Sequence, residues 1–284
     1  MIVEFAGPVR VAFGGASDPG PWARSIAALY PSGRVLEGNS PPEIDLVVET
    51  DRLVIHEPST GVRHRCASRG RLMARLEFLV NARILAGVVD DRAPIHAAGL
   101  VSGDAALLVL GGSGAGKSTL ALAWSRAGHP ILGDDVVLLD SEGWVHPHPR
   151  PIKVERVQLA DFGIDPEETL EHDPEMSEVW VDPAAAGGWS GPTRLGVIVI
   201  ARYRPDAPPA GAVEAMDPPG TLPSLMASLI EVEGRETSEI LDWMIPLSLT
   251  RDCITITFSS ARAAVDPLRT RLLALWASAS PTDR

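Results

Sequence analysis

The sequence predicts an α/β protein in two parts: a small N-terminal α+β region over residues 1–90 and a larger α/β domain over residues 91–284. From residue 93 onward, apolar strand-like runs alternate with helix-like segments, which is typical of an α/β domain with a largely buried sheet. One of these strands leads directly into a glycine-rich loop and then a helix. The first 90 residues instead show short alternating strands, turns and one amphipathic helix.

Composition restricts the classes of protein that this chain can belong to. Its 284 residues are 45% hydrophobic and 22% charged, as in soluble globular proteins, and the formal net charge is −12. That balance argues against a nucleic-acid partner held by phosphate contacts. The two cysteines, Cys66 and Cys253, form no CxxC pair and fit a reducing compartment. We see no signal peptide and no membrane-spanning stretch, so we expect a cytoplasmic protein with no membrane partner.

Strands and one helix are expected in the N-terminal region. Val9–Phe13 alternates, and Asp45–Glu49 with Leu53–Glu57 has the pattern of a hairpin. Arg71–Val89 places apolar residues at helical spacing on one face. No residue of this region carries an obvious chemistry, so it is a candidate substrate-recognition or packing module.

The C-terminal domain contains more strands and helices. Uninterrupted apolar strands such as Ala105–Leu110 are typical of a sheet that is covered on both faces. The expected strands are Ile95–Val101, Ala105–Leu110, Ile131–Leu132, Val136–Leu139, Leu195–Ala201 and Cys253–Phe258. The expected helices are Ser118–Ala127, Thr221–Glu231, Thr237–Met244 and Ala261–Ala277.

The glycine-rich loop fits the phosphate-binding pattern G-x-x-x-x-G-K-[ST] at every fixed position, with a buried-type strand before it and a helix after it. Such glycines let main-chain N–H groups surround an anion, and the following helix adds its positive end. The lysine reaches the β- and γ-phosphates, and the hydroxyl after it binds Mg²⁺. We therefore expect ATP or a close relative, with Mg²⁺, at Gly111, Gly112, Ser113, Gly114, Ala115, Gly116, Lys117, Ser118 and Thr119.

A carboxylate must accompany such a loop, and two positions are candidates. Asp140 follows four apolar residues, which is the usual pattern of a metal-binding strand. Asp134 and Asp135 follow a shorter apolar run and are adjacent, so each raises the pKa of the other. A kinase needs one carboxylate for the metal and one as base for a hydroxyl, which the pair would supply.

Three segments together resemble the C-terminal catalytic domain of bacterial HPr kinase/phosphorylase. They are Ile95-His96-Ala97-Ala98, the loop from Gly111 to Ser118, and the run from Gly128 to Asp135, which begins after Arg126-Ala127. The spacings from His96 to Lys117 and from Lys117 to Asp135 are similar to those of the family. The resemblance covers roughly residues 93–140 well and the rest of the chain weakly.

The resemblance implies a P-loop kinase domain of the HPr kinase/phosphoenolpyruvate carboxykinase type. It implies that Lys117 contacts the phosphates and that Ser118 binds Mg²⁺ with support from Asp134. It also implies that Asp135 is the base for the acceptor hydroxyl and that His96 lies beside the reacting phosphate.

The segment around residues 147–155 differs from the family, whose glycine-rich metal-binding segment has no counterpart here. It is more similar to divergent HPr-kinase-related proteins, some of which phosphorylate a serine of a lasso-peptide precursor. Arg150 and Lys153 would then contact phosphates or a substrate carboxylate; as ordinary surface charges they would have no such role.

The expected activity is therefore the ATP-dependent phosphorylation of a serine hydroxyl in a protein or peptide. Two alternatives stay open: a nucleotide-binding regulatory module with little transfer activity, and a kinase of a small molecule such as free serine. An oligomer is compatible with the resemblance, since hexamers occur in that family.

Overall fold

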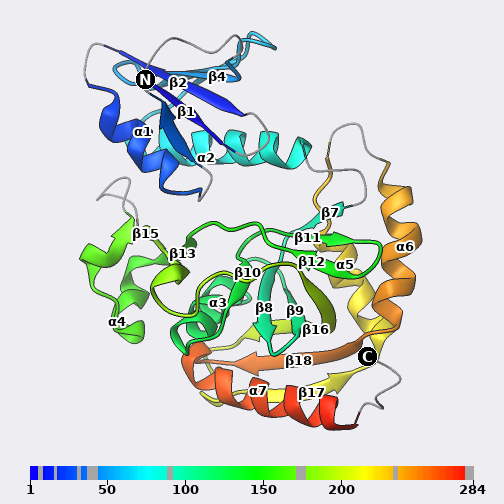
Figure 1. Cartoon of the computed structure of the whole chain (residues 1–284). Helices are drawn as coiled ribbons and strands as arrows, with labels where there is room; N and C mark the ends of the chain where they lie inside the picture. The colour runs from blue at the N-terminus through cyan, green and yellow to red at the C-terminus, as the bar shows by residue number, and fades with distance from the viewer. Residues whose placement is uncertain are drawn as a thin grey trace. The chain divides into compact units, whose positions relative to one another are not determined.

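The computed structural model describes residues 1–5, 9–15, 18–30, 33–36, 44–87, 92–170, 177–232 and 236–278. These residues form a mixed α/β structure with seven α-helices. Their contacts divide the chain into two compact units: unit 1 is Met1–Val89 with Lys153–Val181, and unit 2 is Asp90–Ile152 with Asp182–Arg284 (Figure 1). The segment Lys153–Val181, which the sequence predicts to be part of the C-terminal domain, thus belongs with the N-terminal unit.

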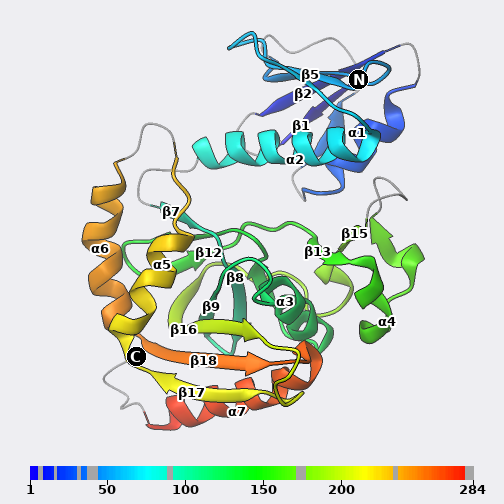
Figure 2. The same ribbon diagram turned by 180° about the vertical axis from the view of Figure 1, so that it is seen from behind.

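Unit 1 is built on a six-stranded sheet in the order β3-β1-β2-β4-β5-β6. Its elements are β1 (Ile2–Glu4), β2 (Arg10–Gly14), α1 (Gly20–Ala27), β3 (Arg34–Leu36), β4 (Leu46–Glu49), β5 (Val54–His56), β6 (Arg63–Arg65) and α2 (Arg69–Ala86). Both helices lie on the same face of the sheet (Figures 1 and 2). Alternate strand residues such as Val11, Val48 and Ile55 pack against α2 residues such as Leu72 and Leu76, so this face of the sheet carries the main apolar cluster of unit 1.

The returning segment forms a small three-stranded sheet in the order β13-β15-β14. Its elements are β13 (Ile152–Glu155), the 3₁₀ helix Arg156–Gln158, α4 (Leu159–Phe162), the 3₁₀ helix Pro166–Glu168, β14 (Thr169–Leu170) and β15 (Glu178–Val181). Trp180 is 1% exposed and belongs to the same apolar cluster as Val11 and Leu76. This buried indole attaches the segment to unit 1.

Unit 2 holds the glycine-rich loop. Its strands are β7 (Arg92–Ile95), β8 (Ala98–Ser102), β9 (Ala105–Leu110), β10 (Ile131–Gly133), β11 (Val137–Asp140), β12 (Trp144–His146), β16 (Thr193–Tyr203), β17 (Ala212–Met216) and β18 (Asp252–Phe258). Its helices are α3 (Lys117–Arg126), the 3₁₀ helices Pro183–Ala185 and Pro218–Thr221, α5 (Leu222–Ser228), α6 (Thr237–Leu249) and α7 (Ala261–Ser278).

The sheet of unit 2 has the order β10-β8-β9-β16-β12-β11-β7, and β18 and β17 branch from β16. Strand β16 runs parallel to β9, with Ile200 opposite Leu110, and parallel to β18, with Tyr203 opposite Phe258. The other pairings are antiparallel. Apolar residues of α5 and α6 pack on one face of this sheet, and α3 packs beside α7 (Figures 1 and 2).

Several predicted elements are confirmed, and one is wrong. The hairpin around residues 50–52 exists, with Val48 opposite Ile55. The helix expected over 71–89 is α2, which begins two residues earlier; residues 88–89 lie outside the described residues. The single strand expected over 95–101 is two strands, because Ile95 pairs with Val137 of β11 whereas Ala98 pairs with Val109 of β9. The chain changes partner at His96-Ala97, so His96 lies in a bend rather than within a strand.

In the part of the chain that the structure describes, no helix is both long enough and apolar enough to cross a membrane.

Candidate functional site

The candidate site lies at one edge of the unit 2 sheet, by which we mean the edge formed by the C-terminal end of β9 and the N-terminal end of β8. Three chain segments converge there. Strand β9 ends at Leu110 and leads into the glycine-rich loop. Because β8 is antiparallel to β9, the bend at His96 before β8 lies at the same edge. Because β10 is antiparallel to β8, with Gly133 opposite Gly99, the chain after β10 also reaches this edge with Asp134 and Asp135. The topology thus gathers residues that are far apart in the sequence.

The loop between β9 and α3 has a positive φ at three glycines, Gly111, Gly114 and Gly116, and at the first and last of them a side chain would also clash. Gly111 has φ +154°, and a Cβ there would lie 2.7 Å from the Cβ of Ala115. Gly116 is left-handed with φ +88°, and a Cβ there would lie 2.8 Å from Cζ of Phe258. Helix α3 begins immediately afterwards, so its first-turn N–H groups and its positive end face the loop. This strand, loop and helix arrangement is the context that the phosphate-binding pattern requires.

Lys117 is folded back over this loop. Its Nζ donates hydrogen bonds to the carbonyl oxygens of Gly111, at 2.7 Å, and Gly112, at 3.4 Å. The residue is 7% exposed, and burial lowers the pKa of its ammonium, while the charges of Asp134 and Asp135 oppose that shift. The ammonium of Lys117 is therefore a buried cation at the loop, and among the described residues it donates hydrogen bonds to main-chain carbonyl oxygens. A phosphate group would bind this ammonium more strongly than these neutral carbonyls do.

Asp134, which directly follows β10, is a buried carboxylate beside Ser118 in the first turn of α3. The residue is 4% exposed, and the Ser118 hydroxyl donates a hydrogen bond to it. Its Oδ1 is buried with no hydrogen-bond partner among the described residues. Burial, together with the charge of Asp135, raises the pKa of Asp134 to about 7. An ionised carboxylate that is buried without a partner is energetically unfavourable, and a cation bound to Oδ1 would compensate for this burial.

The Ser118 hydroxyl and the Asp134 carboxylate fit Mg²⁺ as two oxygen donors, which this cation prefers. The described residues contain no group of three or more His, Cys, Asp or Glu side chains that could hold a metal by themselves. A cation here would therefore need phosphate oxygens and water as its remaining ligands, as is usual for Mg²⁺ at phosphate-transfer sites.

Asp135 and His96 form an accessible pair beside the buried carboxylate. Nδ1 of His96 lies 3.0 Å from Oδ1 of Asp135 and 2.9 Å from its carbonyl oxygen; both are acceptors, so Nδ1 carries the hydrogen. The hydrogen bond with Asp135 raises the pKa of His96, against the opposing effect of burial. The Asp135 side chain is 56% exposed, and its backbone is left-handed with φ +71°, which is uncommon for a residue other than glycine and recurs at functional sites.

Two further residues from the proline-rich segment lie against this pair. Nη1 of Arg150 is 3.9 Å from Oδ2 of Asp135, and the arginine is 7% exposed. His148 is equally buried, and burial lowers its pKa to about 4, so it is neutral beside Asp135. The sequence pattern did not identify His148, because an isolated histidine between prolines gives no sign of burial. Lys153, by contrast, belongs to unit 1, where its Nζ lies 2.7 Å from Oε2 of Glu178.

Asp140, the rival carboxylate, has a different environment. It ends β11 opposite Arg92, at the other end of the strand that begins after Asp135. Its carboxylate accepts the N–H groups of Glu142 and Trp144 and lies 2.6 Å from Nε2 of His146. Burial alone would raise the pKa of Asp140, but these hydrogen bonds hold it below its usual value. This carboxylate closes the turn between β11 and β12.

The structure thus gathers His96, Lys117, Ser118, Asp134 and Asp135 at one edge, with Arg150 beside them. Thr119 lies in the first turn of α3, and the other predicted positions form the loop itself. One loop contact was not expected: the N–H of Tyr203, near the end of β16, donates to the carbonyl of Ala115 at 3.1 Å.

No family model and no curated protein matches this chain. Among solved structures it is similar to the Hpr(Ser) kinase/phosphatase from Coxiella burnetii, at 16% identity and a TM-score of 0.35, over 66% of this chain and 99% of that one.

Proposed function

We propose that unit 2 is a P-loop kinase domain that transfers the γ-phosphoryl group of ATP to a hydroxyl group, most specifically a serine of a protein or peptide. The observation that carries the proposal is the contrast between two adjacent carboxylates beside the loop lysine. Asp134 is buried against Ser118, whereas Asp135 is exposed and paired with His96. A kinase needs this division, with one carboxylate toward the metal and one toward the acceptor.

In the proposed reaction, the acceptor oxygen forms a bond to the γ-phosphorus while the bond from that phosphorus to the bridging oxygen breaks. The acceptor loses its proton to Asp135, and ADP leaves with the bridging oxygen. Lys117 leaves the carbonyls of Gly111 and Gly112 and binds phosphate oxygens. His96, held through Nδ1, keeps the Asp135 carboxylate oriented beside the phosphoryl group.

Ser118 and Asp134 would hold Mg²⁺, which supplies charge neutralisation of the phosphates when it is bound. A bound cation also lowers the pKa of Asp134, so the residue is ionised in the complex. Arg150 lies against Asp135, where it would restrain that carboxylate and meet an anionic group of the acceptor. Lys153, the other residue that could contact phosphate, forms an ion pair with Glu178 within unit 1, so a phosphate contact of Lys153 stays a prediction.

The proposal is tested with labelled ATP, Mg²⁺ and a panel of acceptors: serine-containing peptides, free serine and HPr. Asp135→Asn keeps the shape of the side chain, tolerates a left-handed backbone and removes only the proton acceptor. We expect transfer to fall by about 10²–10⁴-fold, the usual worth of a positioned base, with ATP affinity nearly unchanged.

The matched control is Asp104→Asn, an exposed aspartate in the turn before β9, at the end of that strand away from the loop. It should leave transfer unchanged. Magnesium-dependent ATP binding with no transfer to any acceptor, in the wild type as in Asp135→Asn, would instead support the nucleotide-binding regulatory module. Transfer to free serine alone would support the small-molecule kinase.

A further inference from the structure

An arginine-rich segment of unit 1 stands out from the acidic chain. Between Val62 and Arg75 the sequence has five arginines and no acidic residue, although the whole chain has a net charge of −12. The segment consists of β6, a short connection and the first two turns of α2. No part of it belongs to the phosphate-loop site in unit 2.

Strand β6 is the edge of the six-stranded sheet in the residues that the structure describes. The N–H of Glu57 bonds to the carbonyl of Val62, and the N–H of Cys66 bonds to that of Leu53. Hydrogen-bonded and non-bonded pairs alternate in an antiparallel ladder, so the main-chain groups of Arg63 and Arg65 point away from β5. The edge therefore offers alternate donors and acceptors to an added strand.

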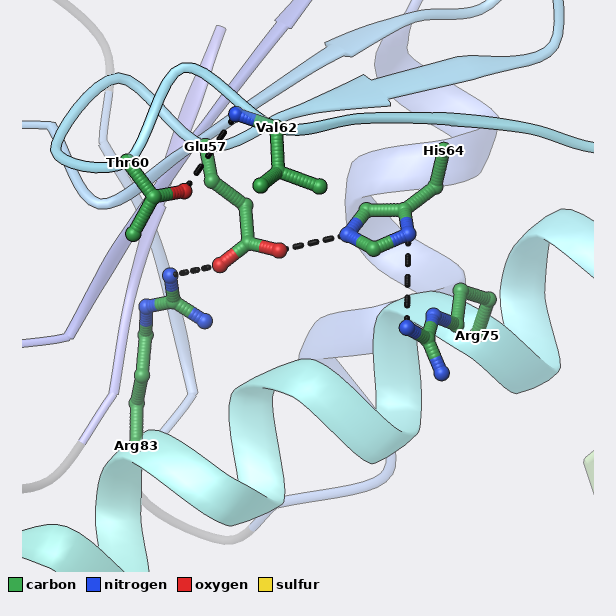
Figure 3. Close-up of polar contacts among 6 residues, drawn as sticks. All are labelled: Glu57, Thr60, Val62, His64, Arg75 and Arg83. Carbon is green, nitrogen blue, oxygen red and sulfur yellow. Dashed lines mark hydrogen bonds and ion pairs between the residues drawn. The ribbon is translucent and has the colours of Figure 1, made fainter. Parts of the chain in front are cut away.

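A polar network fixes this edge to α2 (Figure 3). Nε2 of His64 lies 2.5 Å from Oε1 of Glu57, and Nη2 of Arg83 lies 2.6 Å from Oε2 of the same carboxylate. Nη2 of Arg75 is 3.3 Å from Nδ1 of His64. Arginine only donates, so Nδ1 accepts and Nε2 donates to Glu57. Burial would raise the pKa of Glu57, but the hydrogen bonds from His64 and Arg83 outweigh it and lower the pKa.

The arginines of this edge are only partly neutralised. Arg63 pairs with Glu49 of β4. Arg65 and Arg71 are exposed, and neither has an ion pair with a described residue. The guanidinium of Arg75 lies 5.1 Å from the ring centre of Phe78, a residue that is 60% exposed. The edge thus combines open main-chain groups, positive charge and one exposed aromatic side chain.

We propose that β6 and the adjoining face of α2 are a docking surface for an extended acidic peptide segment of a protein partner. The segment would pair its main chain with Arg63 and Arg65 and place carboxylates near Arg65, Arg71 and Arg75. Such strand addition takes affinity from main-chain hydrogen bonds and specificity from alternate side chains. A second copy of β6 is disfavoured, because it would bring arginines opposite arginines.

The test uses the full chain and a short fluorescein-labelled peptide in which Glu-Glu pairs alternate with Thr-Thr pairs, so that an added strand carries carboxylates on both of its faces. Binding is followed by fluorescence anisotropy. The same peptide with Gln in place of Glu, and an oligouridylate of similar length, are the competing probes. We expect the Glu peptide to bind, with affinity that falls as salt rises, and the Gln peptide to bind more weakly. The double variant Arg65→Gln, Arg71→Gln should weaken binding by about fivefold, the worth of two exposed ion pairs.

Arg34→Gln is the matched control for each single substitution, Arg65→Gln and Arg71→Gln. It removes one positive charge from an exposed position on β3, the opposite edge of the same sheet, and should not change the affinity. Arg65→Pro also removes the outward N–H and should weaken binding beyond Arg65→Gln alone. Equal binding of the Glu and Gln peptides, equal loss in Arg34→Gln, or tighter binding of the oligouridylate would overturn the proposal. The arginines would then only protect the edge from pairing.

Discussion

Replacing Asp134 by asparagine is expected to stabilise the ligand-free protein at alkaline pH. Burial raises the pKa of this carboxyl from an ordinary 3.8 to about 7. The folded state therefore keeps the proton to a higher pH than the unfolded state does. The free energy of unfolding then falls as the pH rises from about 4 to about 7 and is level above that range. Asparagine resembles the protonated form and has no such loss.

The magnitude follows from the shift. Each pKa unit corresponds to about 1.4 kcal/mol, so a shift of about three units amounts to about 4 kcal/mol above pH 7. An amide in place of the carboxyl buries its own polar atoms, which reduces the net gain to about 2–4 kcal/mol. For a chain of this size we expect the thermal midpoint of Asp134→Asn to exceed that of the wild type by roughly 5–10 °C at pH 8, and by much less at pH 5.

The order of stabilities should reverse when Mg²⁺ and ATP are added. A cation that binds the Asp134 carboxylate stabilises the folded wild type through linkage, whereas the amide offers a weaker ligand. The assay is thermal denaturation at pH 5 and pH 8, with and without Mg²⁺ and ATP, with Asp104→Asn as the exposed control. A ligand-free Asp134→Asn protein that is no more stable than the wild type at pH 8 would refute the reasoning, because the carboxylate would then be solvated or already paired.

Three further outcomes are expected. Lys117→Ala should lower phosphoryl transfer at saturating ATP by about 10²–10³-fold; a rate within twofold of the wild type would reject this lysine. Gly116→Ala should destabilise the fold by about 1–3 kcal/mol in denaturant titration, because the backbone there is left-handed and the new Cβ would clash with the ring of Phe258. Gly112→Ala places its Cβ in open space and should leave stability unchanged. Asp140→Asn should lower stability most above pH 4, because His146 and the main-chain N–H groups of the turn stabilise the ionised carboxylate. The same change should leave phosphoryl transfer per folded molecule unchanged. A selective loss of transfer would instead identify Asp140 as the catalytic carboxylate.

The strand, loop and helix from Ala105 to Arg126 could be predicted because their signals are local. An apolar run, a fixed glycine pattern and a following helix occupy one short stretch, so the whole signal lies within that stretch. The hairpin of β4 and β5 is local in the same sense. The convergence of Asp135 and His96, in contrast, depends on the antiparallel pairings of β8 and β10, which no local pattern contains. Only the resemblance to a known family suggested it.

Burial was the other property that the sequence did not reveal. His148 and Arg150 lie in a proline-rich run that has the composition of an exposed loop, yet both are buried beside Asp135. Trp180 anchors the segment Lys153–Val181 in unit 1, although the chain has by then passed through much of unit 2. Both facts come from packing between segments that are distant in sequence.

The two carboxylates that follow apolar strands can now be told apart on physical grounds. Asp140 has its hydrogen bonds satisfied by two main-chain N–H groups and His146, and its pKa is lowered, so it stabilises the fold. Asp134 is buried with an open oxygen and a raised pKa, and its neighbour Asp135 has a left-handed backbone. Unliganded, these features reduce stability, and a fold keeps such features where a ligand compensates them. The regular sequence pattern made Asp140 one of two candidates, whereas the unfavourable environment of Asp134 supports the proposal that this carboxylate binds a cation.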